Sequence, residues 1–267
     1  MKRPFYYLIS AALLSSCAAN PYRISEKSYT KQLKVYQQKI SKKESFPLQN
    51  GINTEWISTV NYNLRKPNFI IIHHTAQDSI AQTLKTFTLV KPQVSAHYVI
   101  GDDGRVVQML NDYLRAWHGG NASWGKNTDI NSASIGIELD NNGSEPFSEL
   151  QINSLLSLLA KLKKEYNIPT QNIIGHSDIS PTRKQDPSAL FPWRVLASKE
   201  FGLWPDSDLE TAPANFNIEL ALRIIGYDTR NLSAAITAFK LHYIQTEVDA
   251  ILDEKTVNTI YNIYKKQ

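Results

Sequence analysis

The chain has 267 residues, of which 42% are hydrophobic and 20% are charged, and its formal net charge is +4. This length allows one enzyme-sized domain and a smaller second domain. The composition is that of an ordinary soluble globular protein. The mild positive charge lacks the clustered basic residues of a nucleic-acid-binding protein, so we expect no nucleic-acid partner.

The first seventeen residues have the order of a secretory signal sequence. Lys2 and Arg3 precede an apolar run over residues 5–14, and small residues follow. The apolar run is too short for a membrane-spanning helix, which needs about 20 residues. We therefore predict that residues 1–17 are a signal peptide and exclude them from the fold.

The sequence LSSC at residues 14–17 resembles the cleavage site of bacterial lipoproteins. The resemblance implies that cleavage leaves Cys17 first and that its thiol carries a lipid. Cys17 is the only cysteine in the chain, so it has no partner for an internal disulfide. More than one acyl chain anchors a protein stably to a membrane. Because Ala18 rather than aspartate follows, the resemblance implies the outer membrane, with the protein facing the periplasm.

Residues 18–50 are polar and rich in lysine. We interpret them as a solvated tether between the lipid and the folded protein. A weak helical pattern surrounds Leu33, Tyr36 and Ile40.

Residues 51–205 alternate between strand and helix patterns. Asp78 is the predicted N-cap of one helix, which ends before Pro92. Ser148 and Gln151 form the capping box of a second helix with an apolar stripe. Strands are predicted over residues 69–72, 95–100, 106–110, 133–139 and 171–175. This order predicts an α/β fold with a mixed central β-sheet flanked by helices.

Residues 206–267 are predicted to form a small C-terminal three-helix domain. The chain is loop-like from residue 205 to 213, and helical patterns follow over residues 217–225, 232–244 and 254–265.

Two strand ends carry candidate site residues. Alternate residues of a strand point to opposite faces, so only one of His73 and His74 is a ligand candidate. On the later strand, Ser134, Gly136 and Glu138 share a face, and the glycine leaves room beside the carboxylate.

A third candidate region is the polar loop after residue 175. It contains His176, Asp178 and Asp186, and functional residues often lie on such loops. The ten-residue spacing between His176 and Asp186 is not a local helical metal motif. On spacing alone, the loop remains an open candidate and either carboxylate is eligible.

The chain contains five short motifs in order: IHHT at residues 72–75, SAHY at 95–98, AWH at 116–118, SIGIEL at 134–139, and GHSD at 175–178 continuing to the lysine at 184 and the Asp-Pro pair at 186–187. A Phe-Pro-Trp sequence follows at 191–193. Taken together, these motifs resemble the zinc-dependent N-acetylmuramoyl-L-alanine amidases, which share a fold with peptidoglycan recognition proteins. The resemblance covers roughly residues 52–204.

Carried over residue by residue, the resemblance implies that His73, His176 and Asp186 bind one zinc ion. It thereby selects His73 over His74 and Asp186 over Asp178. Two histidines and a carboxylate leave the fourth position of a catalytic zinc open. Glu138 matches the general base, and Lys184 matches the residue that stabilises the developing oxyanion.

The resemblance also extends to weaker positions. Trp117 and His118 match residues that line the substrate groove, although the tryptophan also suits simple packing. His97 is expected either to contact substrate or to orient a metal ligand. Residues 215–266 resemble a peptidoglycan-binding domain, which would add a second contact to the cell wall.

The sequence thus predicts a monomeric, lipid-anchored zinc enzyme that hydrolyses the amide bond between N-acetylmuramic acid and L-alanine in peptidoglycan or muropeptides. The anhydro form of the sugar is a further candidate substrate. Two alternatives remain: a non-catalytic lipoprotein that tethers the outer membrane to peptidoglycan, and a zinc peptidase that cuts within the stem peptide. The zinc content of the protein would distinguish the enzyme from the non-catalytic tether. The masses of the reaction products would distinguish the amidase from the peptidase.

Overall fold

The computed structural model describes residues 20–42, 54–58, 64 and 66–267. The chain divides into two compact units, residues 1–59 and 60–267. The signal sequence, Cys17 and the two ends of the tether, residues 18–19 and 43–50, lie outside the described residues, so the signal and lipid assignments stay predictions. Within the described ranges, every helix is too short or too polar to cross a bilayer.

The first unit contains helix α1 (Arg23–Ser41), which has no buried side chain. It includes the predicted pattern at Leu33, Tyr36 and Ile40 but is much longer. Ile40 is 79% exposed. Within this unit, local hydrogen bonds and helix propensity support the helix.

The described part of the second unit contains a five-stranded sheet in the order β3-β2-β4-β1-β5. Strand β1 pairs in parallel with β4 and with the edge strand β5. Strand β4 pairs in parallel with β2, and β2 pairs antiparallel with β3. This mixed sheet confirms the predicted fold class. The strands are β1 (Phe69–His74), β2 (Tyr98–Ile100), β3 (Val106–Gln108), β4 (Ser134–Leu139) and β5 (Ile173–Gly175).

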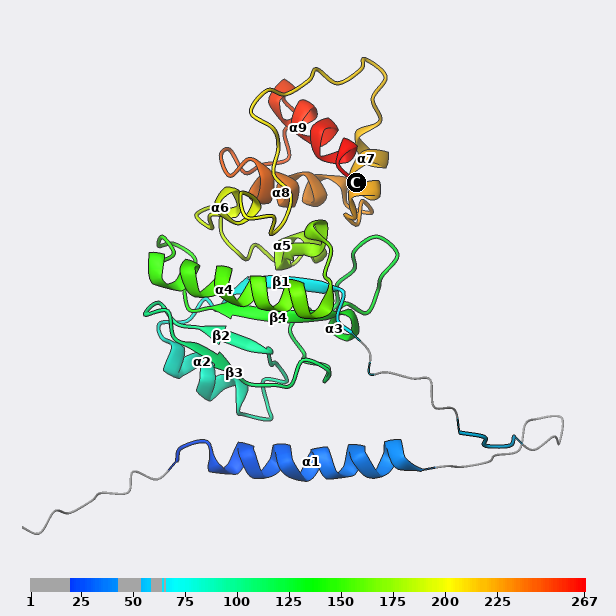
Figure 1. The fold of residues 1–267 in the computed structure, drawn as a ribbon. Coiled ribbons are helices and arrows are strands. Elements are labelled where there is room, and N and C mark those ends of the chain that lie inside the picture. The colour runs from blue at the N-terminus through cyan, green and yellow to red at the C-terminus, as the bar shows by residue number, and fades with distance from the viewer. Residues whose placement is uncertain (1–19, 43–53, 59–63, 65) are drawn as a thin grey trace, which may run out of the picture. The chain divides into compact units, whose positions relative to one another are not determined.

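Helix α4 (Glu149–Tyr166) covers one face of this sheet (Figure 1). Its stripe buries Leu155, Leu159 and Leu162 in the same core as Ile70 and Ile72 of β1. A strand covered on both faces needs a continuous apolar run, which explains the three consecutive isoleucines of β1.

The start of α4 differs in part from the predicted capping box. The Ser148 hydroxyl accepts from the backbone N–H of Gln151 at 3.1 Å, as predicted. The Gln151 amide instead donates to the carbonyls of Ile100 and Asp140, at 3.0 Å each. The glutamine therefore ties the helix to the sheet and does not complete the box.

Helix α2 (Ile80–Phe87) begins one residue later than predicted. The side chain of Ser79, not that of Asp78, accepts from the backbone N–H of Gln82. A serine at the N-cap satisfies a helix N–H as well as aspartate does. Shorter elements complete the sheet's connections: α3 (Ile130–Ala133), the 3-10 turn η1 (Thr170–Asn172), α5 (His176–Ile179) and α6 (Trp193–Ala197).

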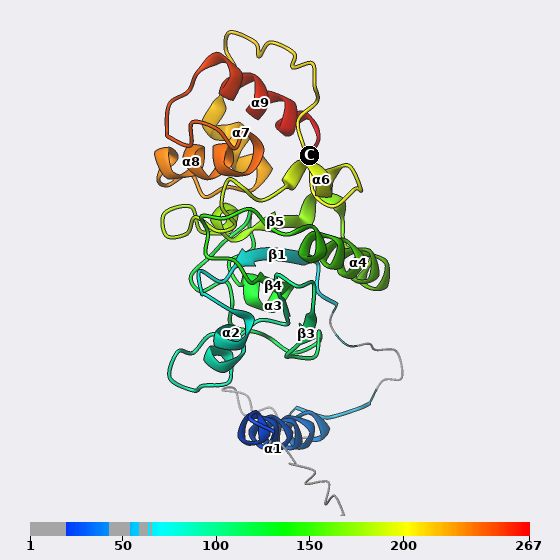
Figure 2. The ribbon, with the colours of Figure 1, turned by 90° about the vertical axis from the view of Figure 1, so that its left-hand side faces the viewer.

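Three helices, α7 (Ile218–Ile225), α8 (Leu232–Tyr243) and α9 (Glu254–Lys265), confirm the three C-terminal helical patterns. Figures 1 and 2 show them grouped beyond the β5 edge, next to α5 and α6. Their buried side chains share one core with the sheet face opposite α4. This core includes Ile71, Ile174, Ile179, Leu222, Ile225, Ile236 and Phe239. The predicted domain boundary near residue 205 stays a prediction.

A buried polar contact joins α5 to these helices. Asp178 is fully buried and accepts from Tyr227 Oη at 2.5 Å, from His242 Nδ1 at 2.7 Å and from the Gly175 backbone N–H at 2.7 Å. The His242 ring is stacked between Trp193 and Tyr243, with ring centroids 3.9 and 4.0 Å away. Both carboxylate oxygens of Asp178 are therefore used in hydrogen bonds within the protein, which gives this residue a structural role.

We expect Phe239→Ala to lower the free energy of unfolding of residues 60–267 by about 3–5 kcal/mol, because the ring is fully buried in the shared core. Denaturant titration, followed by circular dichroism and tryptophan fluorescence, would measure it. Leu220→Ala, at a side chain 48% exposed, is the control and should change stability by less than about 0.5 kcal/mol. A separate early transition of the helices alone would contradict a shared core.

Candidate metal centre

The carboxyl ends of three adjacent parallel strands bring the candidate residues together. His73 of β1 and Glu138 of β4 are direct partners in the β1–β4 register. Gly175 of β5 is opposite Ile72, so the next residue, His176, follows beside His73. Parallel strands end at one edge of a sheet, which is where such folds form their binding sites.

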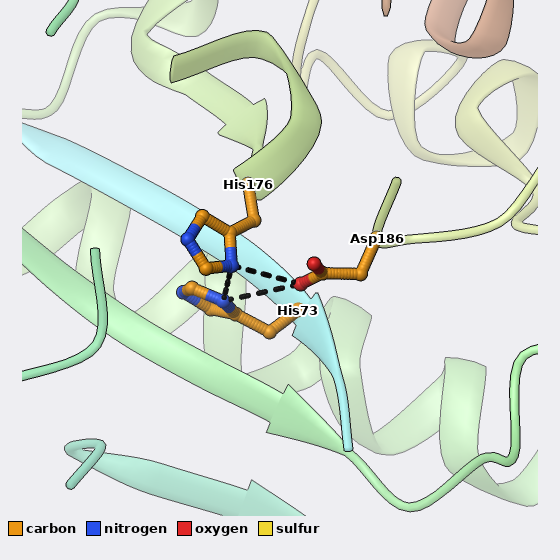
Figure 3. A group of neighbouring side chains, drawn as sticks. All are labelled: His73, His176 and Asp186. Carbon is orange, nitrogen blue, oxygen red and sulfur yellow. Dashed lines mark hydrogen bonds and ion pairs between the residues drawn. The ribbon is translucent and has the colours of Figure 1, made fainter. Parts of the chain in front are cut away.

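His73, His176 and Asp186 converge on one point (Figure 3). The Nδ1 atoms of the two histidines are 2.9 Å apart, and Asp186 Oδ2 is 3.0 Å from His176 Nδ1 and 3.3 Å from His73 Nδ1. Ligands about 2.0–2.1 Å from a tetrahedral zinc would be about 3.3 Å apart. The group thus fits zinc after shifts of a few tenths of an ångström, and Asp186 rather than Asp178 supplies the carboxylate.

Hydrogen bonds behind the ligands hold two of them in place. His176 Nε2 donates to the Gly119 carbonyl at 3.2 Å, so Nδ1 is the ring nitrogen that faces the group. The Ser177 backbone N–H donates to the Asp186 carbonyl at 2.8 Å and so closes the loop that carries this carboxylate. Such supporting bonds orient metal ligands.

Burial favours the protonation states that bind a metal. Desolvation, reinforced by the charge of His176, lowers the pKa of His73 to about 4, so its ring is neutral at neutral pH. Desolvation opposes ionisation of Asp186, but the close approach of the His176 and His73 rings outweighs it and lowers the pKa of this carboxyl. A neutral imidazole and a carboxylate are the forms that coordinate zinc.

Glu138 lies beside the three ligands and is only 9% exposed. Its Oε1 is 3.9 Å from His73 Nδ1. Burial, with a smaller contribution from the charge of Asp186, raises the pKa of Glu138 to about 8, against the opposing charge of Lys184. Lys184 is half-buried and lines the same cleft of about 240 Å³.

The three residues predicted to bind substrate differ in how far their side chains are buried. Trp117 is 51% exposed on the wall of the cleft, where a substrate can reach it. His118 is buried at the base of the cleft, with its Nδ1 3.0 Å from His73 Nε2. His97 is fully buried, and its ring nitrogens bond the Leu114 carbonyl and the Gly136 N–H. His97 therefore has no free ring nitrogen for a substrate, and its bonds go to backbone groups, so the predicted orientation of a metal ligand stays a prediction.

Sequence reasoning did not identify the residues that support the ligands from behind. Asn131 Oδ1 accepts from the backbone N–H groups of His118 and Gly119, at 3.1 and 2.8 Å. Arg183 donates to the Gly119 carbonyl at 2.7 Å. These partners are separated by 12 to 64 residues along the chain, and no local pattern signals such contacts.

The raised pKa of Glu138 predicts a pH-dependent stability difference in the metal-free protein. The unfolded carboxyl ionises near its ordinary value of 4.5, whereas the folded one keeps its proton to about 8. The folded state therefore binds more protons in this window, and this group's contribution to stability falls as pH rises. Glu138→Gln cannot titrate, so its stability relative to wild type should increase between about pH 5 and about pH 8.

Denaturant titration in the presence of a chelator would measure this difference. Glu149→Gln, at an exposed position in the first turn of α4, is the matched control and should show no such increase. A constant difference between Glu138→Gln and wild type would contradict the raised pKa.

The sequence is similar to a known protein family and to several of its characterised members. Residues 63–189 match the N-acetylmuramoyl-L-alanine amidase family. The chain is 29% identical to N-acetylmuramoyl-L-alanine amidase AmiD of Escherichia coli K12, over 96% of this chain and 95% of that one. It is 42% identical to 1,6-anhydro-N-acetylmuramyl-L-alanine amidase AmpD of Haemophilus influenzae, over 40% of this chain and 59% of that one.

Two solved structures are similar over most of the chain. One is E. coli AmiD in complex with anhydro-N-acetylmuramic acid-L-Ala-D-gamma-Glu-L-Lys, with 28% identity and a TM-score of 0.68 over 82% of this chain and 97% of that chain. The other is AmpDh3 of Pseudomonas aeruginosa, with 27% identity and a TM-score of 0.69 over 79% and 96%. Together with the strand-end cluster, these matches show that residues 63–189 are similar to the N-acetylmuramoyl-L-alanine amidase family.

Proposed function

We infer that this chain hydrolyses the amide bond between N-acetylmuramic acid and L-alanine in peptidoglycan or its muropeptides. The observation that carries this inference is the group of His73, His176 and Asp186 with Glu138 beside it, in one cleft of a segment that matches the amidase family. The relative AmiD was solved with an anhydro-muramyl peptide, which supports acceptance of the anhydro form here.

We propose that the three converging ligands hold one zinc ion per chain. Their spacing and composition suit a tetrahedral site with one position left for water or substrate. When bound, zinc would polarise the scissile carbonyl and make a water molecule more acidic.

Glu138 and Lys184 are the proposed catalytic residues. Glu138 takes the proton of the attacking water and passes it to the departing amine of L-alanine. Without metal, burial keeps this carboxyl protonated to about pH 8, and the positive charge of a zinc ion bound beside it would favour the ionised form that a general base requires. Lys184 lines the same cleft and supplies positive charge for the carbonyl oxygen as negative charge develops on it.

Mass spectrometry of digested peptidoglycan tests this function. We expect peptide-free sugar together with intact peptides that begin with L-alanine. A chelator should abolish the reaction and added zinc should restore it. Glu138→Gln should keep stoichiometric zinc but lower kcat by about 10²- to 10⁴-fold, because the base is lost while the ligands remain.

Glu149→Gln is the matched control, since this exposed carboxylate lies on α4 away from the cleft. Shortened stem peptides that stay attached to sugar would identify a peptidase instead. A wild-type protein with no stoichiometric zinc and no products would identify a non-catalytic tether. Full activity of Glu138→Gln would show that the base is assigned wrongly.

We also propose that a lipid on Cys17 anchors the protein to the outer membrane, facing the periplasm, as a monomer. The support is the sequence LSSC at residues 14–17 after a charged and apolar leader.

Cys17→Ser removes the thiol that would carry the lipid. Both proteins would be expressed in a bacterium that processes lipoproteins. The wild type should fractionate with outer membranes and the variant should not, because a signal sequence without a lipid does not anchor a protein in the outer membrane. Membrane fractionation with immunoblotting measures this. Equal membrane retention of both proteins would contradict the anchor.

A further inference from the structure

The buried ring of His118 lies between a proposed zinc ligand and strand β4. Its Nδ1 is 3.0 Å from His73 Nε2, and its Nε2 is 3.1 Å from Ser134 Oγ. A Cβ on Gly136 would come 2.4 Å from His118 Cγ. The glycine thus makes room for the imidazole on the face that Ser134, Gly136 and Glu138 share.

The hydrogen bonds of Ser134 determine where the protons of this chain of contacts lie. The Ser134 hydroxyl is 2.6 Å from the Ile130 carbonyl oxygen, which only accepts, so the hydroxyl proton is used there. Ser134 Oγ must then accept from His118 Nε2–H. A neutral His118 carries one ring proton, so its Nδ1 presents a lone pair.

The same proton count continues into the metal centre. Since His118 Nδ1 is an acceptor, His73 must donate from Nε2. The lone pair of the neutral His73 ring is then on Nδ1, the atom 2.9 Å from His176 Nδ1 and 3.3 Å from Asp186 Oδ2. The hydrogen bonds that link the Ile130 carbonyl, Ser134, His118 and His73 therefore require one tautomer of His73, the one protonated at Nε2.

We propose that His118, held by Ser134, is a positioning residue that fixes His73 in the tautomer and ring orientation needed to bind zinc. The proposal rests on the proposed zinc site. It assigns His118 a role through His73, in contrast to the direct substrate contact that the sequence resemblance implies.

Zinc affinity separates these two roles. We expect His118→Ala to raise the zinc dissociation constant about 10- to 100-fold, the usual effect of losing a partner behind a metal ligand. His118→Asn keeps an amide oxygen near the position of Nδ1 and should recover most of the affinity. Trp117→Ala, at the exposed neighbouring ring, should leave zinc affinity unchanged. Competition with a chromophoric chelator measures all four proteins, and circular dichroism checks their folding.

A measurement on the wild type guards against variants that fail to fold. Long-range ¹H–¹⁵N correlation spectra report the tautomer of each histidine, and we expect protonation at Nε2 of both His118 and His73. Wild-type zinc affinity in folded His118→Ala, or a His73 ring protonated at Nδ1 in the zinc-bound protein, would overturn the proposal. A wild type that binds no zinc would instead overturn the proposed function.

Discussion

The parallel pairing of β1 with both β4 and β5 is the constraint on which the site depends. This register sets His73 beside Glu138 and brings the first residue after β5, His176, next to them. Strand side chains alternate between faces, so a shift by one residue would replace His73 with an isoleucine or with His74. Continuous burial of β1 between two layers holds the register in place.

Burial and neighbouring groups together shift the pKa values of the clustered residues and so determine their charges. Desolvation lowers the pKa of His73 and of His118 and raises that of Glu138, whereas the neighbouring histidines hold the pKa of Asp186 low. The cluster therefore combines neutral imidazoles with one ionised carboxylate, a set of lone pairs suited to a divalent cation. The Glu138 carboxyl retains a strong affinity for protons in the same cleft.

The sequence predicted most of the fold because its patterns are local. The apolar run of β1, the stripe of α4 and the three C-terminal helices follow from residue periodicity. For the site, strand alternation limited the choice to one histidine of a pair, but only the family resemblance selected Asp186 over Asp178. The positions of His97 and His118 beneath the surface depend on contacts with Leu114, Ser134 and Gly136 that no local pattern encodes.

The buried side chain of Asp178 has a further consequence, which concerns how a peptidoglycan strand would be oriented relative to the cleft. Asp178 is two residues from His176 and takes its side-chain hydrogen bonds from Tyr227 and His242 of the C-terminal region. Because a buried polar group costs free energy when it loses its hydrogen-bond partners, these bonds resist separation of the helices from the loop that carries His176. If the helices grip a glycan strand, the angle at which that strand passes the cleft is therefore set by the protein. The enzyme would then select cleavable bonds by their geometry along the strand as well as by their chemistry.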